Sequence, residues 1–493
     1  MTVVHLPWVE RTALHLPSLR GGVRFVGLMS AVFLSTVLLA SGPSPAGPIN
    51  FGPYQDQAVS LLQQYIRINT SNPPGNELAA AQFFHRLFDA AHIPNTVYMF
   101  APGRADIYAV LRGAGSLPPI VLLSHMDVVQ AVPSEWRAPP FSGQIIHGMI
   151  YGRGAMDMKD MGVMEAMVML IAARERPNLK RNLIFLATGD EEVNDQGSAW
   201  LLDHHPELVR GAGYLITEGG SNVIRSTGPN GAKIYGIGVA EKAPLWLRLT
   251  AHGRGGHGSI PIPDSAPNQL ARALGRIIKW QPPVQLIPAV AEYFENIAST
   301  EPQPRSSEFR HISKSIKNPA FVQRLSRAPE FNYLIRDTVS LTGMRAGTQT
   351  NVIPSAASAD LDVRLLPGSD PNKFIRQLRK VIGNGAITIE KTSDFRPPNA
   401  SPTDTSLYRI IKSVVQSYDP GALVTPVLNS GYTESQMYRS LGPHGIVCYG
   451  FTPVLVTAAI EATEHAPNER VPVDQIRRGV KMLYQIVMEA ASK

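Results

Sequence analysis

The sequence predicts an α/β fold, in which a mainly parallel sheet with helices on both faces forms a catalytic domain and a smaller α+β domain is inserted into it. Three observations lead to this prediction. Near-continuous apolar runs such as PIVLLS (119–124) and NLIFLAT (182–188) are typical of strands buried on both faces. Segments with helical apolar spacing alternate with these runs, as in a parallel sheet. From about residue 243, strands that alternate apolar and polar residues appear, which is typical of antiparallel pairing.

The elements follow in order along the chain. In the first half, helices are expected at 55–67, 77–92, 159–174 and 197–204, and strands at 106–112, 119–124, 182–188 and 212–217. In the inserted part, strands are expected at 245–253, 357–368 and 386–391, and helices at 266–280 and 371–382. Residues 284–340 are predicted to be a mostly helical elaboration. The last elements are a helix at 404–418, a strand at 446–450 and an amphipathic helix at 472–490.

These elements divide the chain of 493 residues into three parts. Residues 1–53 are a targeting segment and linker, residues 54–242 and 396–493 form the catalytic domain, and residues 243–395 form the inserted smaller domain. The single cysteine, Cys448, excludes an intramolecular disulfide and a cysteine-cluster metal site. The net charge of +7 comes without a Lys/Arg block, so no nucleic-acid partner is expected.

The amino terminus carries a targeting signal. Arg11, Arg20 and Arg24 precede an uncharged apolar run at 25–40. A helix of that length, at ~1.5 Å per residue, spans about 24 Å, which is short of the ~30 Å hydrocarbon core. An export signal is therefore favoured, which implies a periplasmic or secreted protein. The alternative is an uncleaved N-terminal anchor that holds the rest of the protein outside the membrane.

Polar side chains follow the buried strands where such sheets bind ligands, beyond the carboxyl ends of the strands. The candidate metal ligands, one from each cluster of His or acidic residues, are His125, Asp157, Glu192, Glu218 and His465. Two imidazoles and three carboxylates suit Zn²⁺ or a similar divalent metal. If one carboxylate bridges two ions, each ion has one His, one terminal carboxylate and the shared one, as in two-metal hydrolytic sites.

Two further acidic residues have roles beside the ligands. Glu191 and Glu192 are neighbours whose side chains diverge, so one can bind metal while the other acts as general base. Asp127 lies two residues from His125 and is expected to accept the second imidazole N–H and fix its tautomer. Each of these signals is weak alone, since an acidic triplet is usually solvated surface. Their joint placement after successive strands favours a metal site.

At these residues the chain resembles the dimetal exopeptidases, the family of glutamate-releasing carboxypeptidases, aminoacylases and succinyl-diaminopimelate desuccinylases. The motifs that carry the resemblance are SHMDVV (124–129), GMIYGRGAMDMK (148–159), GDEE (189–192), TEGG (217–220), HGRGGHGS (252–259), TNVIPSAASADLDVR (350–364) and EHAPNE (464–469). PPFSG, the helical insert and the apolar N-terminal run resemble the branch of Gly-X carboxypeptidases and N-fatty-acyl-amino-acid synthase/hydrolases.

The resemblance implies two Zn²⁺ ions per subunit, with Co²⁺ or Mn²⁺ as substitutes, and assigns roles to named residues. Asp157 matches the bridging ligand and Glu191 the general base. It also implies that the smaller domain is a lid that dimerises, so that His257 reaches the partner's active site and stabilises the oxyanion. Asn351 and Arg364 match positions that hold the substrate's carbonyl and carboxylate. The GYTE segment at 431–434 resembles a pocket loop, but Glu434 replaces the usual Asp.

These implied roles favour a metallo-carboxypeptidase that cleaves small peptides or N-acyl amino acids with a free C-terminal carboxylate. The alternative within enzymes is an N-fatty-acyl-amino-acid amidohydrolase that also runs in the direction of synthesis. A remote alternative from another class is a non-catalytic, membrane-tethered binding protein on the same fold. It would require loss of a ligand or of Glu191, and all of them are present.

Overall fold

The structure is a computed structural model that describes residues 48–225, 231–441 and 445–493. The expected targeting segment lies outside these residues, apart from the last part of its linker. Within the described ranges, no helix has both the length and the apolar character needed to cross a membrane.

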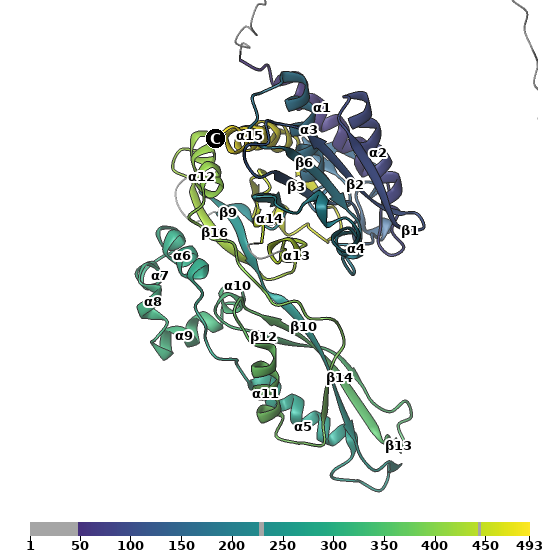
Figure 1. Cartoon of the computed structure of the whole chain (residues 1–493). Helices are drawn as coiled ribbons and strands as arrows, with labels where there is room; N and C mark the ends of the chain where they lie inside the picture. Colours follow the sequence, from purple (N-terminus) through teal and green to yellow (C-terminus); the bar gives the residue numbers. More distant parts are fainter. Residues whose placement is uncertain (1–47, 226–230, 442–444) are drawn as a thin grey trace, which may run out of the picture. The chain divides into compact units, whose positions relative to one another are not determined.

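A large mixed sheet forms the centre of the catalytic domain (Figure 1). Its middle strands run parallel in the order β6 (Leu183–Thr188), β3 (Ile120–His125), β7 (Tyr214–Thr217) and β17 (Val447–Gly450). Beyond β6, strands β2 (Arg104–Leu111) and β1 (Asn95–Ala101) pair antiparallel. Beyond β17 the order continues with β9 (Ala232–Glu241), β8 (Asn222–Arg225) and β18 (Val456–Thr457), and β16 (Leu423–Asn429) also pairs with β9. The predicted parallel pairing therefore holds at the centre. The pairs beyond β6 are antiparallel, whereas beyond β17 antiparallel pairs (β17–β9 and β8–β9) combine with parallel ones (β16–β9 and β18–β8).

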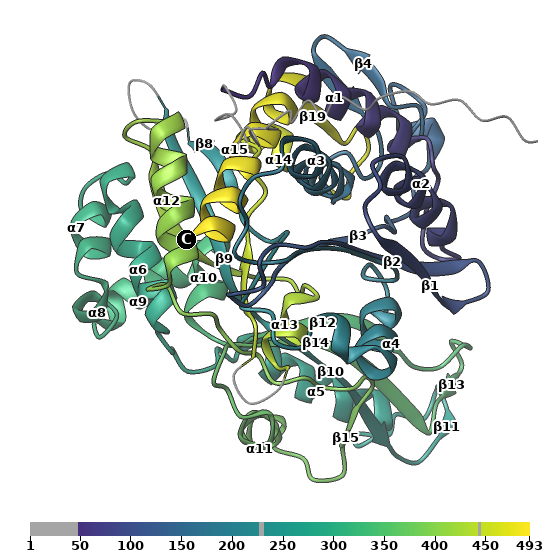
Figure 2. The same ribbon diagram turned by 45° about the horizontal axis from the view of Figure 1, so that its top comes forward.

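Helices cover both faces of this sheet, as predicted (Figure 2). The side chains of β3 show why, because all six residues are buried and alternate residues point into different cores. Ile120 and Leu122 belong to the main core, and Val121 and Leu123 belong to a smaller core on the opposite face. The helices of the main core are α1 (Gly52–Ile66), α2 (Glu77–Ala90), α3 (Lys159–Glu175), α12 (Ser406–Tyr418) and α15 (Val473–Ser492). Those of the smaller core are α4 (Gln196–His204) and α13 (Ser435–Arg439).

The inserted domain has its own antiparallel sheet and its own core. The strand order is β12 (Thr338–Arg345), β14 (Ala356–Leu365), β10 (Ala243–His252) and β15 (Thr388–Lys391). Burial alternates along β10, as the sequence predicted. The buried side chains pack under α5 (Ala266–Lys279) and α11 (Pro371–Ile382). A separate short pair, β11 (Gly256–His257) and β13 (Val352–Ile353), carries the His257 loop.

The helical elaboration packs against the catalytic domain, although its chain ends lie in the inserted domain (Figure 1). Its helices are α6 (Pro288–Ile297), α7 (Arg305–Arg310), α8 (Ile312–Ser315), α9 (Pro319–Ser326) and α10 (Pro329–Asn332). Helix α6 lies on β16, where Asn296 Nδ2 donates to Thr425 Oγ1 at 3.3 Å. The expected range of 284–340 was too long at its end, because β12 begins at Thr338.

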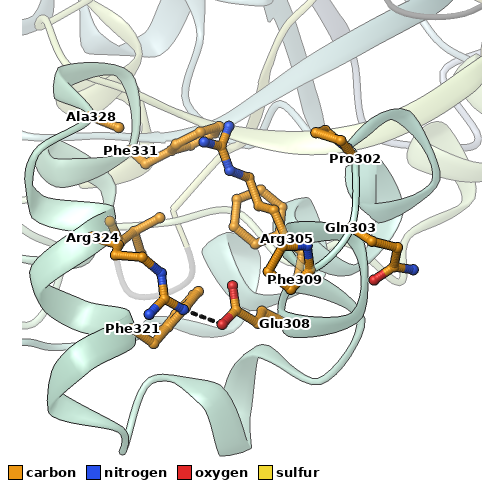
Figure 3. Close-up of a pocket in the computed structure, with 11 residues that line it drawn as sticks. Pro302, Gln303, Arg305, Glu308, Phe309, Phe321, Arg324, Ala328 and Phe331 are labelled. Carbon is orange, nitrogen blue, oxygen red and sulfur yellow. Dashed lines mark hydrogen bonds and ion pairs between the residues drawn. The ribbon is translucent and has the colours of Figure 1, made fainter.

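The elaboration encloses a small pocket of about 210 Å³ between its own helices (Figure 3). Phe309, Phe321 and Phe331 form its buried walls. Arg324 pairs with Glu308 at its edge, and Arg305 lies over the ring of Phe331. The pocket therefore belongs to the packing of the elaboration itself.

The candidate metal site is positioned by a small three-stranded sheet, which the sequence did not predict. Strands β4 (Gln144–Ile146), β5 (Met149–Tyr151) and β19 (Arg470–Pro472) form a three-stranded sheet. β19 pairs with β5, with Arg470 opposite Tyr151. This pairing places the segment around His465 beside the turn that carries Asp157. A short helix, α14 (Ala458–Glu461), precedes that segment.

A candidate dinuclear metal centre

The five candidate ligands come together at one edge of the large sheet. His125 is the last residue of β3, Glu218 directly follows β7, and Glu192 lies in the loop after β6. Because these strands are parallel neighbours, their carboxyl ends meet at the same edge. Asp157 and His465 reach this edge through the paired strands β5 and β19.

Asp157 lies between the two histidines, with one carboxylate oxygen toward each. Its Oδ1 is 3.0 Å from His125 Nε2, and its Oδ2 is 2.7 Å from His465 Nε2. Glu218 Oε2 lies 3.6 Å from His125 Nε2, and Glu192 Oε2 lies 3.3 Å from His465 Nε2. The five side chains thus form two groups that share Asp157, each with one imidazole and one terminal carboxylate. This arrangement is the one that two ions with a bridging carboxylate require.

The donor atoms fit a divalent metal. Possible ligand atoms of His125, Asp157 and Glu192 all lie within 4.8 Å of one another, and the same holds for His125, Glu191 and Glu218. Glu192 Oε1 is buried and has no hydrogen-bond partner among the described residues. A buried carboxylate oxygen without a partner is costly, and a cation at this point would satisfy it. The roles of the individual ligands stay predictions.

The crowded carboxylates of the site raise the pKa values of both histidines. Hydrogen bonds to Asp157 and Glu192 raise the pKa of His465 to about 11. Burial alone would lower the pKa of His125, but the carboxylates of Glu218 and Asp157 raise it well above its usual range. Burial raises the pKa of Glu218 to about 7.

The Glu191 side chain lies beside the candidate ligands His125 and Glu218. Its side chain is half-buried and its carboxylate has no hydrogen-bond partner in the part of the chain that the structure describes. Burial, and then the nearby carboxylate of Glu218, raise its pKa well above the usual value. A free carboxylate beside the ligands, with a raised pKa, has the properties of a general base.

Asp127 contacts the site differently from what the sequence suggested. The acceptor for His125 Nδ1 is the main-chain carbonyl of Asp127 at 3.0 Å, whereas the carboxylate Oδ1 lies at 3.7 Å. The carboxylate instead accepts the main-chain N–H groups of Glu191 (3.1 Å) and Glu192 (3.2 Å). The residue still orients His125, through its backbone, and its side chain fixes the loop that carries the base.

The residues expected from the lid have their contacts within the lid. His257 is exposed, and its Nδ1 contacts Ser259. Asn351 is exposed, and its carbonyl accepts from Gly258 N. Arg364 donates to both carboxylate oxygens of Asp362, at 2.8 and 3.2 Å. The guanidinium of Arg364, which is expected to hold the substrate's carboxylate, is thus paired with the carboxylate of Asp362 in this structure.

One buried acidic residue near the site, Glu469, was not assigned a role from the sequence. Glu469 is fully buried, and its Oε1 accepts from Met156 N at 2.9 Å while its Oε2 pairs with Arg153. It therefore supports the turn that carries Asp157, and the second acidic residue of EHAPNE was the available signal. Glu434, in the segment that resembles a pocket loop, is buried, and both its carboxylate oxygens lie 2.8 Å from Thr188 Oγ1 at the end of β6.

Comparison with known proteins agrees with this arrangement. The sequence profile described as Peptidase family M20/M25/M40 matches residues 121–489. The chain is 28% identical over 457 residues to the Homo sapiens N-fatty-acyl-amino acid synthase/hydrolase PM20D1, covering 88% of this chain and 87% of that protein. It is 27% identical over 379 residues to the Dictyostelium discoideum "Probable carboxypeptidase S-like 2", covering 76% and 72%. In fold it is similar to the M20 family metallo-carboxypeptidase Sso-CP2 from Sulfolobus solfataricus, with a TM-score of 0.66, 19% identity and coverage of 88% and 99%.

Proposed function

This chain belongs to Peptidase family M20/M25/M40, and from that premise we propose that it cleaves the amide bond of small peptides or N-acyl amino acids that carry a free C-terminal carboxylate. That it is a metal-dependent hydrolase of peptides or N-acyl amino acids follows from the family and the relatives. The observation that carries the proposal furthest is Asp157, whose two oxygens face two different imidazoles.

The chain's own residues divide the work at this site. His125, Glu218, His465 and Glu192 would hold two divalent ions, with Asp157 between them. Bound there, such ions supply Lewis acidity that polarises a scissile carbonyl and lowers the pKa of water. In this proposal Glu191 takes the proton from the attacking water and delivers it to the leaving nitrogen. The carboxylate of Asp127 holds the backbone of Glu191 by accepting its main-chain N–H at 3.1 Å.

Zinc is the metal that we propose. Two imidazoles with carboxylates are a usual zinc donor set, and Co²⁺ or Mn²⁺ can replace zinc in such sites. Elemental analysis of the purified protein tests this directly, with two equivalents of zinc per chain as the expected result. A single equivalent would contradict the bridging geometry.

The lid is proposed to complete the site. Arg364 would exchange its contact with Asp362 for the substrate's carboxylate, since a guanidinium pairs with either carboxylate in the same bidentate way. Asn351 would hold the substrate's carbonyl. His257, in an exposed glycine-flanked loop, would stabilise the oxyanion from the partner subunit of a homodimer.

The similarity to PM20D1 supports a second candidate, hydrolysis and synthesis of N-fatty-acyl amino acids. A substrate panel on the zinc-reconstituted protein separates the two candidates. It compares Gly-X dipeptides with N-oleoyl amino acids, each also as the C-terminal amide. Loss of turnover with the amides is expected in both cases, because both candidates require the free carboxylate. Equal turnover of acids and amides would contradict the proposed recognition by Arg364.

We propose export for the whole chain, on the basis of the arginine-flanked apolar run at 25–40. An uncleaved anchor remains the alternative. Sequencing the amino terminus of the protein isolated from its native cells decides between them, since a start beyond residue 40 requires cleavage.

A further inference from the structure

Asn72 lies in a buried network directly beneath the loop that carries Glu191 and Glu192. Its side chain is only 5% exposed. The amide nitrogen donates one hydrogen to Asp127 Oδ2 at 2.8 Å and the other to Asp190 Oδ1 at 2.7 Å. One NH₂ group thus joins two buried carboxyl groups, which could not hydrogen-bond each other if both were ionised.

The two carboxyl groups that Asn72 joins hold the loop at two points. Asp127 accepts the main-chain N–H groups of Glu191 and Glu192. Asp190 precedes them with a left-handed backbone (φ 76°), a conformation that residues other than glycine rarely adopt. Its carboxylate is held by Arg104 Nη1 at 2.9 Å as well as by Asn72. The direction in which Glu191 leaves the sheet depends on both points.

The network is fixed at its other end, so Asn72 is not itself mobile. Its main-chain N–H donates to Val128 O at 2.9 Å, and Thr70 Oγ1 donates to Met126 O at 2.7 Å. These bonds tie the loop that contains Asn72 to the chain just after β3. Arg104 is in turn held by Glu77, with Nε 2.8 Å from Oε2.

We propose that Asn72 is a positioning residue for the general base: by donating to Asp127 and Asp190 at once, it sets the loop geometry that aims Glu191 at the substrate. The inference rests on the proposed function for the role of Glu191, but the loop geometry can be tested separately. Asn72→Ala and Asn72→Asp both lose the two donors. Because Asn72→Asp also places a third carboxyl group beside Asp127 and Asp190, the comparison that isolates the donors is Asn72→Ser against Asn72→Ala. Serine and alanine are similar in volume, so the two variants behave alike if Asn72 only fills space, whereas Asn72→Ser is milder if Asn72 acts through its N–H groups.

The first test measures amide hydrogen exchange in the peptide that spans residues 189–196, and it requires no turnover. In Asn72→Asp and Asn72→Ala, the amides of Glu191 and Glu192 are expected to exchange at least about tenfold faster, with α3 unchanged. The matched control is Asn95→Ala on β1, which also removes an asparagine–carboxylate bond (Asn95 Nδ2 to Asp89 Oδ1, 2.8 Å). Native exchange rates in both Asn72 variants would overturn the proposal. If Asn72→Asp does not fold, Asn72→Ser retains one donor and is expected to exchange at an intermediate rate, whereas a native rate would overturn the proposal.

The second test asks whether Asn72 acts through Glu191. In the wild-type background, Asn72→Ala is expected to lower kcat at least about tenfold with KM within about threefold, as for a misplaced catalytic group. In a Glu191→Gln background the same change should have almost no further effect on kcat. Additive losses would overturn the proposal. A wild-type protein that turns over no member of the substrate panel would refute the proposed function, while hydrogen exchange would still decide the role of Asn72.

Discussion

Replacing Glu191 with glutamine separates proton transfer from metal binding. Glutamine has the shape of glutamate, and the main-chain N–H of residue 191 remains bonded to Asp127. The side chain has no hydrogen-bond partner among the described residues, so no structural contact is lost. Its raised pKa arises from burial and then from Glu218, so removing its charge relieves repulsion rather than creating it. We therefore expect the free energy of unfolding to change by no more than about 0.5 kcal/mol.

The expected effect is on turnover alone. Loss of a general base typically costs ~10²–10⁴-fold in rate, and at ~1.36 kcal/mol per tenfold this corresponds to about 2.7–5.4 kcal/mol of transition-state stabilisation. The metal content should stay at the wild-type value, because Glu191 is outside the two groups that share Asp157.

The assay combines elemental analysis with kcat on the best substrate of the panel, and Glu192→Gln is the matched control. That neighbour faces His465 at 3.3 Å and should lose metal as well as activity. The reasoning is refuted if Glu191→Gln keeps activity within tenfold of wild type, or if it loses metal to the same degree as Glu192→Gln.

Three further predictions follow from the same structure. Asp157→Ala should remove both metal ions, whereas His125→Ala and His465→Ala should each weaken mainly one, because only Asp157 faces both imidazoles; metal titration of the three variants checks this, and equal one-metal losses would contradict it. If the chain forms the proposed homodimer, mixing the inactive His257→Ala and Glu191→Gln variants under subunit exchange should restore about a quarter of wild-type activity, since half of the dimers would be mixed and each would have one complete site; no recovery despite proven exchange would place His257 in its own chain's site or outside catalysis. Burial raises the pKa of the Cys448 thiol to about 12 from an ordinary value of 9.0, so between about pH 9 and 12 the unfolded chain loses this proton while the folded protein keeps it. The contribution of this group to the free energy of unfolding is therefore complete below pH 9 and is lost as pH rises through 12. At pH 8 the native protein should not react with a thiol reagent and the unfolded chain should react once, whereas a rapid native reaction would show that Cys448 is accessible.

Much of the fold could be predicted because local pattern and tertiary context agree. The six buried residues of β3 form a continuous apolar run, and a strand with neighbours on both sides and helices on both faces requires that pattern. Strand β9 was missed because Ala232–Glu241 contains two glycines. These weaken a strand signal. Glycine is required at both positions because segments distant in the sequence pack closely against them. A Cβ on Gly238 would lie 2.2 Å from Gly219 O, and one on Gly236 would lie 2.7 Å from a Val427 side-chain carbon.

The helical elaboration shows a limit of a different kind. Its apolar spacing predicted helices correctly, but an apolar face does not specify its partner. Phe294 is fully buried in the main core rather than in the core of the inserted domain. The partner is β16, a strand more than a hundred residues later in the chain.

The candidate site likewise combines features that the sequence predicts with features that only the tertiary structure shows. The sequence by itself predicted which side chains would carry the chemistry, because metal ligation and proton transfer require His and carboxylates and these follow the strand ends. It also determined the family, which the profile match over residues 121–489 confirms. Only the tertiary structure decided that β19 brings His465 to Asp157 and that Asn72 joins Asp127 to Asp190. The physical reason is that residue type and local periodicity are written along the chain, whereas hydrogen-bond partners are set by which distant segments pack together.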